Sequence, residues 1–124
     1  GLRITLNQFY DRYQKPVYIT ENGSGFLDRQ EHDGSIHDDY RINYYREHLK
    51  AIREALRDGV DLRGYYVWGP IDIISCSSSE MSKRYGFIYV DQDDYGNGSK
   101  QRYLKDSYFY YQKVTASNGA DLDW

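Results

Sequence analysis

The sequence predicts an α/β fold that is incomplete within these 124 residues. Two short runs of β-branched and aromatic residues, 17–20 and 62–68, are typical of buried strands, and a long amphipathic pattern lies between them. A strand, a helix and a strand in this order form a βαβ unit, whose two strands run parallel. Two strands and three helices cannot close a parallel sheet on both faces, so we expect its edges to stay open.

The first segment predicts a helix over residues 2–13, because apolar residues recur there at helical spacing. Lys15-Pro16 ends this helix, since proline cannot continue it. Val17–Thr20 is predicted to be a buried strand, and Glu21 follows it directly. Residues 23–37 are rich in Gly, Asp, Glu and His without any period, which predicts a long loop.

A second helix is predicted to begin at Asp38 or Asp39, because aspartate commonly caps helix N-termini. Gly59 occupies the usual place of a C-terminal glycine and is expected to end the helix. Its apolar residues draw one stripe, formed by Ile42, Tyr45, Leu49, Ile52 and Leu56.

The remaining chain alternates strand-like and loop-like segments before a last helix. We expect a second strand over Leu62–Trp68, a serine-rich loop over Gly69–Ser82, a strand segment over Arg84–Val90, a turn over Asp91–Ser99 and a helix over Ser107–Thr115. The tail from Ser117 is expected to be frayed.

The charge and the apolar pattern argue against nucleic acids and membranes as partners. With 16 Lys+Arg against 19 Asp+Glu, the formal net charge is -3, which does not suggest a nucleic-acid-binding face. No apolar run approaches the roughly 20 residues that cross a bilayer, and no signal-peptide pattern is present. The single Cys76 fits a reducing compartment such as the cytoplasm. The chain opens on Gly1 inside a predicted helix, so we expect a fragment.

Two residues at strand ends are candidates for chemistry. Glu21 stands at the C-terminal end of a buried strand, where α/β folds place their active sites, although a surface carboxylate opening a loop fits equally well. Trp68 ends the second strand and can stack on the apolar face of a sugar ring. Packing in the core is the simpler interpretation of Trp68.

Polar side chains of the serine-rich loop form a second candidate group. Ser75 and Tyr85 supply hydroxyl donors and Lys83 supplies a compact positive charge. Together they suit a phosphate, which carries about -1.5 to -2 charge near neutral pH. A solvated polar loop explains the same residues.

The sequence gives no defensible metal site. His32, His37 and His48 lie near several acidic residues, but their spacing matches no zinc pattern, and a solvated acidic loop is the better interpretation. Cys76 has no histidine at a suggestive position and is interpreted as a small loop residue. We therefore expect neither a metal nor an organic cofactor.

Four ordered segments closely resemble motifs of glycoside hydrolase family 1, the β-glucosidase family. They are Lys15–Gly23, similar to its nucleophile motif, Asp39–Leu49, similar to the following helix, Gly64–Asp72, similar to the next strand, and Arg84–Asp91, similar to its closing signature. The resemblance runs nearly end to end and implies that residues 1–124 are the C-terminal part of one (β/α)₈ TIM barrel domain, with its last two βα units.

The resemblance also implies a retaining hydrolase with Glu21 as the nucleophile and Trp68 as the sugar-stacking platform. In the family the acid/base glutamate lies in an Asn-Glu-Pro motif far upstream, and this motif is absent here. The resemblance therefore implies that the 124 residues do not catalyse hydrolysis by themselves.

The resemblance implies a phosphorylated substrate, because this sequence departs from the plain glucosidases at one sugar-binding position. Those members carry a sugar-binding Glu where this chain has Ser75, and a carboxylate there would repel a 6-phosphate. Lys83 and Tyr85 match the rest of the Ser…Lys-x-Tyr site of members that cleave 6-phospho-β-glycosides. Cys76 replaces a usual Trp and leaves room, while Ser78 or Ser79 could assist or replace Ser75.

The interpretation that follows is hydrolysis of a small phosphorylated β-glucoside in the cytoplasm. A plain β-glucosidase, a 6-phospho-β-galactosidase and a non-catalytic sugar-binding or assembly module stay open as alternatives. We expect no nucleic-acid or membrane partner, and we expect the fragment to associate with itself through its open sheet edges.

Overall fold

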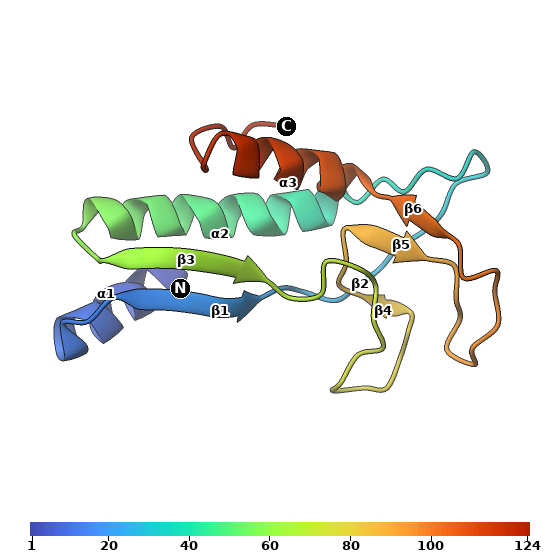
Figure 1. Cartoon of the computed structure of the whole chain (residues 1–124), viewed down its shortest axis with the longest axis horizontal. Coiled ribbons are helices and arrows are strands. Elements are labelled where there is room, and N and C mark those ends of the chain that lie inside the picture. The colour runs from blue at the N-terminus through green and yellow to red at the C-terminus, as the bar shows by residue number, and fades with distance from the viewer.

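The two parallel strands of the predicted βαβ unit, β1 (Val17–Asn22) and β3 (Leu62–Val67), lie side by side in the computed structural model, which describes residues 1–124 (Figure 1). Helix α1 (Leu2–Tyr13) precedes β1, and α2 (Asp39–Arg57) is the crossover helix between the strands. The predicted order and the parallel pairing are both confirmed.

The rest of the chain adds short antiparallel pairs and a third helix. These elements are β2 (Phe26–Leu27), β4 (Lys83–Arg84), β5 (Ile88–Val90), β6 (Arg102–Leu104) and α3 (Asp106–Ala116). β2 pairs with β4, and β5 pairs with β6. Helix α3 packs on α2, on the side away from β1 (Figure 1).

Four short strands depart from the sequence expectation. β2 lies inside residues 23–37, which the sequence predicts to be loop, and β6 lies where no strand is predicted. The single segment expected over Arg84–Val90 is divided into β4 and β5. The division falls at Gly86, where an added Cβ would lie 2.4 Å from the backbone nitrogen of Asp72. This backbone approach requires glycine and interrupts the strand.

The apolar stripe of α2 faces the sheet and α3, with one exception. Ile42, Tyr45 and Ile52 are buried and Leu49 packs against both core clusters, whereas Leu56 is 48% exposed. Asp38 occupies the N-cap position but makes no side-chain capping bond, because its carboxylate accepts from the backbone N–H of Ser107 instead.

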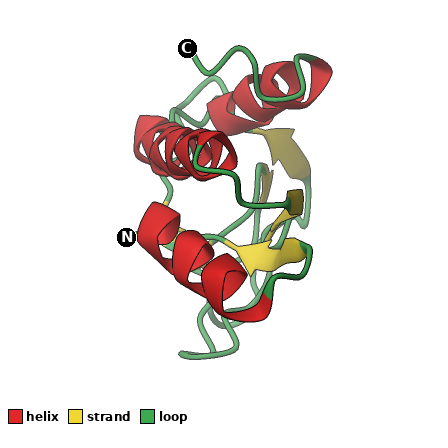
Figure 2. Cartoon of the chain, turned by 90° about the vertical axis from the view of Figure 1, so that its left-hand side faces the viewer, coloured by secondary structure: helices red, strands yellow, loops and turns green.

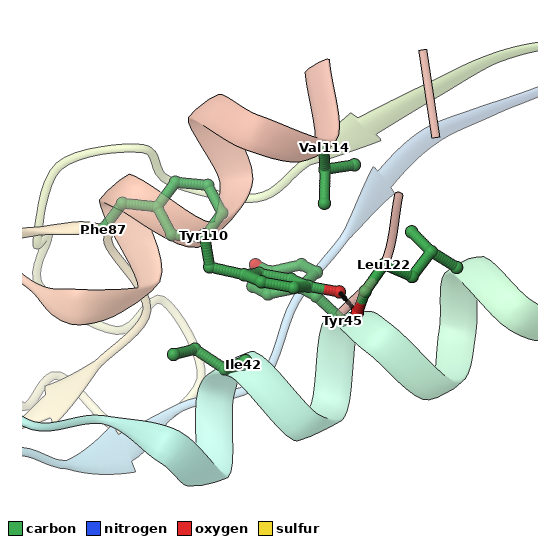
Figure 3. Packing of buried hydrophobic residues seen from close by; sticks show 6 residues of the cluster. All are labelled: Ile42, Tyr45, Phe87, Tyr110, Val114 and Leu122. Carbon is green, nitrogen blue, oxygen red and sulfur yellow. Dashed lines mark hydrogen bonds between the residues drawn. The ribbon is translucent and has the colours of Figure 1, made fainter. Parts of the chain in front are cut away.

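The C-terminal tail is ordered against α2 and α3, so the expectation of fraying is wrong. Leu122 is 5% exposed and belongs to the core cluster shown in Figure 3, and the Tyr110 hydroxyl donates to its carbonyl at 3.3 Å. Burial of one leucine side chain contributes about 1.5–3 kcal/mol. That gain opposes part of the entropy cost of ordering the tail.

Helices cover only one face of the two-stranded sheet (Figure 2). On the other face Tyr18 is 52% and Tyr66 57% exposed, and neither β1 nor β3 has a partner on its outer edge. The structure is thus a partial α/β sheet, as predicted. None of its helices has the length and apolar character of a membrane span.

Candidate active site

Glu21 and Trp68 come together because β1 and β3 are parallel and end at the same edge. The strand β1 extends through Asn22, two residues beyond the predicted end. Glu21 is therefore the penultimate residue of the strand and does not follow it. The backbone N–H of Trp68 donates to the carbonyl of Asn22 at 2.8 Å, which ties the two strand ends together. Glu21 is an exposed residue at this edge.

An open pocket of about 460 Å³ lies at this edge. It is lined by Glu21, Asn22, Gly23, Trp68, Cys76, Ser77 and Tyr85. Glu21 is the only carboxylate in this lining. The exposed Cys76 also lines this pocket, and its small side chain leaves the pocket entrance open.

The polar residues predicted to hold phosphate are neighbours in space. Ser75 Oγ lies 3.1 Å from Ser77 Oγ, and Lys83 Nζ donates to Ser77 Oγ at 3.2 Å. Lys83 Nζ also lies 5.8 Å from the ring centroid of Tyr85. The Ser75 hydroxyl lowers the pKa of the Tyr85 phenol, and Lys83 lowers it further, against the opposing effect of burial. The group is therefore suited to an anion.

Ser77 is the member of this group that the sequence interpretation missed. Ser75 is only 1% exposed and lies behind Ser77, which lines the pocket. The side chains of Ser78 and Ser79, weighed as assistants from the sequence, take no part in the hydrogen bonds of the group, although the backbone N–H of Ser79 donates to the carbonyl of Ser75 at 2.8 Å. Residues 76–78 form a turn, so the sequence offered no periodic signal that would have placed Ser77 beside Ser75.

Gly25 is packed against the two long side chains of this group. A Cβ added at Gly25 would lie 2.6 Å from Lys83 Cγ and 3.0 Å from Tyr85 Cζ. Both side chains therefore cross the backbone of Gly25 closely, Tyr85 on its way to the pocket and Lys83 on its way to Ser77. Any larger residue would displace Lys83 near its base, where it has little freedom to adjust.

Asn22 anchors the chain next to Glu21 from the helix side of the sheet. Its Nδ2 donates to the Tyr44 hydroxyl at 3.1 Å, and the Tyr65 hydroxyl donates to its Oδ1 at 2.7 Å. The Tyr44 hydroxyl in turn donates to the carbonyl of Gly23 at 3.2 Å. Phenols from α2 and β3 thus fix the backbone on which the candidate nucleophile stands.

The acidic loop is partly buried, which corrects the expectation that it is solvated. The side chains of Asp28 and Asp38 are both fully buried. Arg41 Nη2 donates to Asp28 Oδ1 at 2.9 Å, and Lys105 Nζ pairs with Asp28 Oδ2. The same ammonium group donates to Asp72 Oδ1 at 2.7 Å. The complete charge network comprises Asp28, Asp38, Arg41, Asp72, Arg84 and Lys105.

The three histidines do not converge. His37 Nδ1 contacts Asp106 Oδ2 at 2.7 Å, and this hydrogen bond raises the pKa of His37. His48 Nδ1 contacts the carbonyl of Tyr44 at 2.8 Å, and His32 is exposed. Their side chains serve different local contacts, with no grouping of three potential metal ligands.

Known proteins resemble this chain along nearly its whole length. The aryl-phospho-β-D-glucosidase BglH of Bacillus subtilis is 62% identical over 122 residues, covering 98% of this chain and 26% of that protein. The 6-phospho-β-glucosidase AscB of Escherichia coli is 57% identical over 123 residues, covering 99% of this chain and 26% of that protein. This chain spans about a quarter of the length of these relatives.

Solved structures give the same result for the fold. The family 1 β-glucosidase of Thermotoga maritima superposes with a TM-score of 0.87 at 36% identity, covering 98% of this chain and 26% of that chain. The architecture is therefore part of a (β/α)₈ barrel, as predicted. The sequence model of glycosyl hydrolase family 1 matches residues 1–120, and the chain belongs to this family.

Proposed function

We propose that the whole protein containing this chain is a retaining glycosidase that hydrolyses 6-phospho-β-glucosides. The observation that carries the proposal is that the candidate catalytic residues and the candidate phosphate-binding residues meet at one pocket. A carboxylate and an indole, Glu21 and Trp68, line the pocket together with Ser77 and Tyr85. The names of the relatives, a phospho-glucosidase in each organism, support the same substrate class.

Glu21 is the nucleophile in this proposal. Its carboxylate attacks the anomeric carbon, the bond to the aglycone breaks, and a glycosyl-enzyme ester forms. Water then releases the sugar from the ester. The hydrogen bonds of Asn22 to Tyr44 and Tyr65 support this role, because they fix the adjacent backbone during the attack.

The acid/base partner comes from outside these 124 residues. A retaining mechanism needs two carboxyl groups about 5–5.5 Å apart, and Glu21 is the only carboxylate lining the pocket. The proposal therefore assigns catalysis to the whole protein, and the 124-residue chain by itself is inactive.

The phosphate is bound by Lys83, Tyr85 and the two serines. Lys83 brings a positive charge, and Ser75, Ser77 and Tyr85 bring hydroxyl donors. Trp68 stacks on the pyranose ring beside them. The substrate is a small phosphorylated sugar, so the proposal includes a cytoplasmic location and requires no metal or organic cofactor. The single cysteine supports that location.

Lys83→Ala in the whole protein tests the phosphate site. We expect KM for 4-nitrophenyl β-D-glucoside 6-phosphate to rise about 10- to 100-fold, because a charge-assisted hydrogen bond contributes about 1.5–3 kcal/mol. The exposed Lys50 on α2, paired with Glu47 at 2.9 Å, provides the matched control Lys50→Ala, which leaves KM unchanged. Steady-state kinetics with both variants measure the difference.

The alternatives give different results in the same assays. Equal rates of the wild type on the plain glucoside and its 6-phosphate would indicate a plain β-glucosidase. Preference for the galactoside 6-phosphate would indicate a 6-phospho-β-galactosidase. A non-catalytic module predicts no Asn-Glu-Pro motif upstream, whereas the enzyme places that motif roughly 200 residues before Glu21, as expected from barrel length.

The isolated chain is expected to associate with itself. The face that exposes Tyr18 and Tyr66 and the unpaired outer edges of β1 and β3 require cover. Light scattering on the purified 124-residue chain measures its mass. A monodisperse monomer of 14.7 kDa would contradict this expectation.

A further inference from the structure

We infer that Arg84 is a positioning residue that orients Lys83 and Tyr85 toward the substrate phosphate, an inference that rests on the function proposed above. Arg84 lies between them in the sequence, but its guanidinium points into the buried charge network. Lys83 and Tyr85 both pack against Gly25, whereas the Arg84 guanidinium contacts Asp72, which agrees with side chains alternating at this strand. Fixing Arg84 therefore fixes the direction of both neighbours.

The guanidinium of Arg84 is held by partners on several segments. Its Nη1 donates to Asp72 Oδ2 at 2.9 Å and to the Val90 carbonyl at 2.8 Å, and its Nη2 donates to the Gln92 carbonyl at 2.9 Å. The same group lies 4.0 Å from the ring centroid of Tyr89. Arg84 is only 6% exposed, so these bonds form away from competing water.

The backbone of Arg84 is also fixed. Its carbonyl accepts a hydrogen bond from Arg41 Nη2 at 2.9 Å, and β4 pairs with β2 through Phe26 and Arg84. On the pocket side, Gly25 leaves only enough space for the Lys83 and Tyr85 side chains in their present places. The two phosphate-binding side chains are thus confined between Gly25 and the anchored Arg84.

Removal of the guanidinium releases this arrangement. Asp72 keeps its bonds from Lys105, Gly86 and Val90 but loses the one from Arg84, and the carbonyls of Val90 and Gln92 lose a side-chain donor. The two-residue strand β4 then loses its side-chain anchor and keeps its pairing with β2 and the bond from Arg41. A small rotation of β4 then separates Lys83 from Ser77 and moves the Tyr85 hydroxyl. A misplacement of about 1 Å at a substrate contact can cost on the order of 100-fold.

The test uses the whole protein with the variants Arg84→Met and Arg84→Lys and with 4-nitrophenyl β-D-glucoside 6-phosphate. We expect Arg84→Met to raise KM about tenfold or more while kcat changes by less than about threefold. Arg84→Lys retains one donor for Asp72 and should give an intermediate KM. Arg57→Met, an exposed arginine at the end of α2, is the control and leaves both constants unchanged.

The pattern of KM and kcat separates positioning from a loss of folded protein. Partial unfolding removes active molecules, which lowers the apparent kcat and leaves KM as it was. That result, or an unchanged KM in Arg84→Met, overturns the inference. If Arg84→Met does not fold, the KM of Arg84→Lys decides alone. A separate assay compares the wild type on the glucoside and on its 6-phosphate. Equal rates there would contradict the proposed function itself, whatever the Arg84 variants show.

Discussion

Glu21→Gln in the whole protein is expected to lower kcat on 4-nitrophenyl β-D-glucoside 6-phosphate by on the order of 10⁴- to 10⁶-fold, the range seen when a catalytic nucleophile is removed. The amide has the shape of the carboxylate but cannot form the glycosyl ester. KM is expected to change little, because the proposed phosphate site formed by Lys83, Tyr85 and Ser77 is unchanged. Steady-state kinetics with active-site titration measure this loss.

A matched control lies in the serine-rich loop. Glu80 is exposed and its side chain lies outside the pocket lining, so Glu80→Gln should retain full activity. A second variant, Glu21→Ala, vacates space beside the anomeric carbon, and sodium azide should restore turnover by taking the place of the carboxylate. Glu21→Gln activity within tenfold of the wild type would remove Glu21 from the role of nucleophile.

Asp28→Asn is expected to reduce the free energy of unfolding of the whole protein by about 3–5 kcal/mol, the cost of breaking a buried ion pair by removing one partner. Asp28 accepts from Tyr40 at 2.6 Å and from Arg41 at 2.9 Å, and it also pairs with Lys105. Without its charge, both buried cations lose a partner. Urea denaturation measures the change as a lower midpoint.

The same carboxylate predicts the acid sensitivity of the wild type. Burial alone raises the pKa of Asp28, but the charges of Lys105 and Arg41 outweigh it and hold the pKa below its ordinary value. A carboxyl group with a lower pKa in the folded state stabilises the fold above its unfolded pKa, about 3.9, and this contribution is lost as the pH falls through the folded pKa. The wild type therefore loses stability below about pH 4, and Asp28→Asn loses less over this interval.

An exposed ion pair serves as the control for both measurements. Lys50 and Glu47 lie on the solvent side of α2, with side chains 53% and 55% exposed. Solvent screens such a pair, so Lys50→Ala should leave the urea midpoint unchanged. An unchanged midpoint in Asp28→Asn as well would mean that the buried network does not stabilise the fold.

The long elements were predictable from the sequence because they repeat a period. The stripe from Ile42 to Ile52 and the β-branched run of β1 each give several matching positions. β2 and β4 contain only two residues each, which is too short for any period, and they exist only because Phe26 meets Arg84 across the chain. Strands of this kind depend on tertiary pairing, which a local pattern does not contain.

The place of the candidate site was predictable, because Glu21 and Trp68 stand at the ends of two parallel strands. The roles of these two residues, like those of Ser75, Lys83 and Tyr85, rest on the family resemblance and stay predictions. The burial of Asp28 could not be predicted, because its partner Lys105 is 77 residues away. When Lys105 is not considered, the segment around Asp28, rich in Gly, Glu and His, has the composition of a solvated loop. Ser77 was missed because its neighbours on both sides are equally small and polar.

The base of the serine-rich loop is closed independently of the residues at its tip. Asp72 accepts from the backbone N–H of Gly86 at 3.0 Å and of Val90 at 3.3 Å, both of which lie beyond the loop. The bonds of Asp72 therefore do not depend on the exposed side chains from Ser77 to Glu80. Exchanges at these exposed positions alter the pocket lining at Ser77 while the bonds of Asp72 stay in place, so the pocket and the fold can vary separately in this segment.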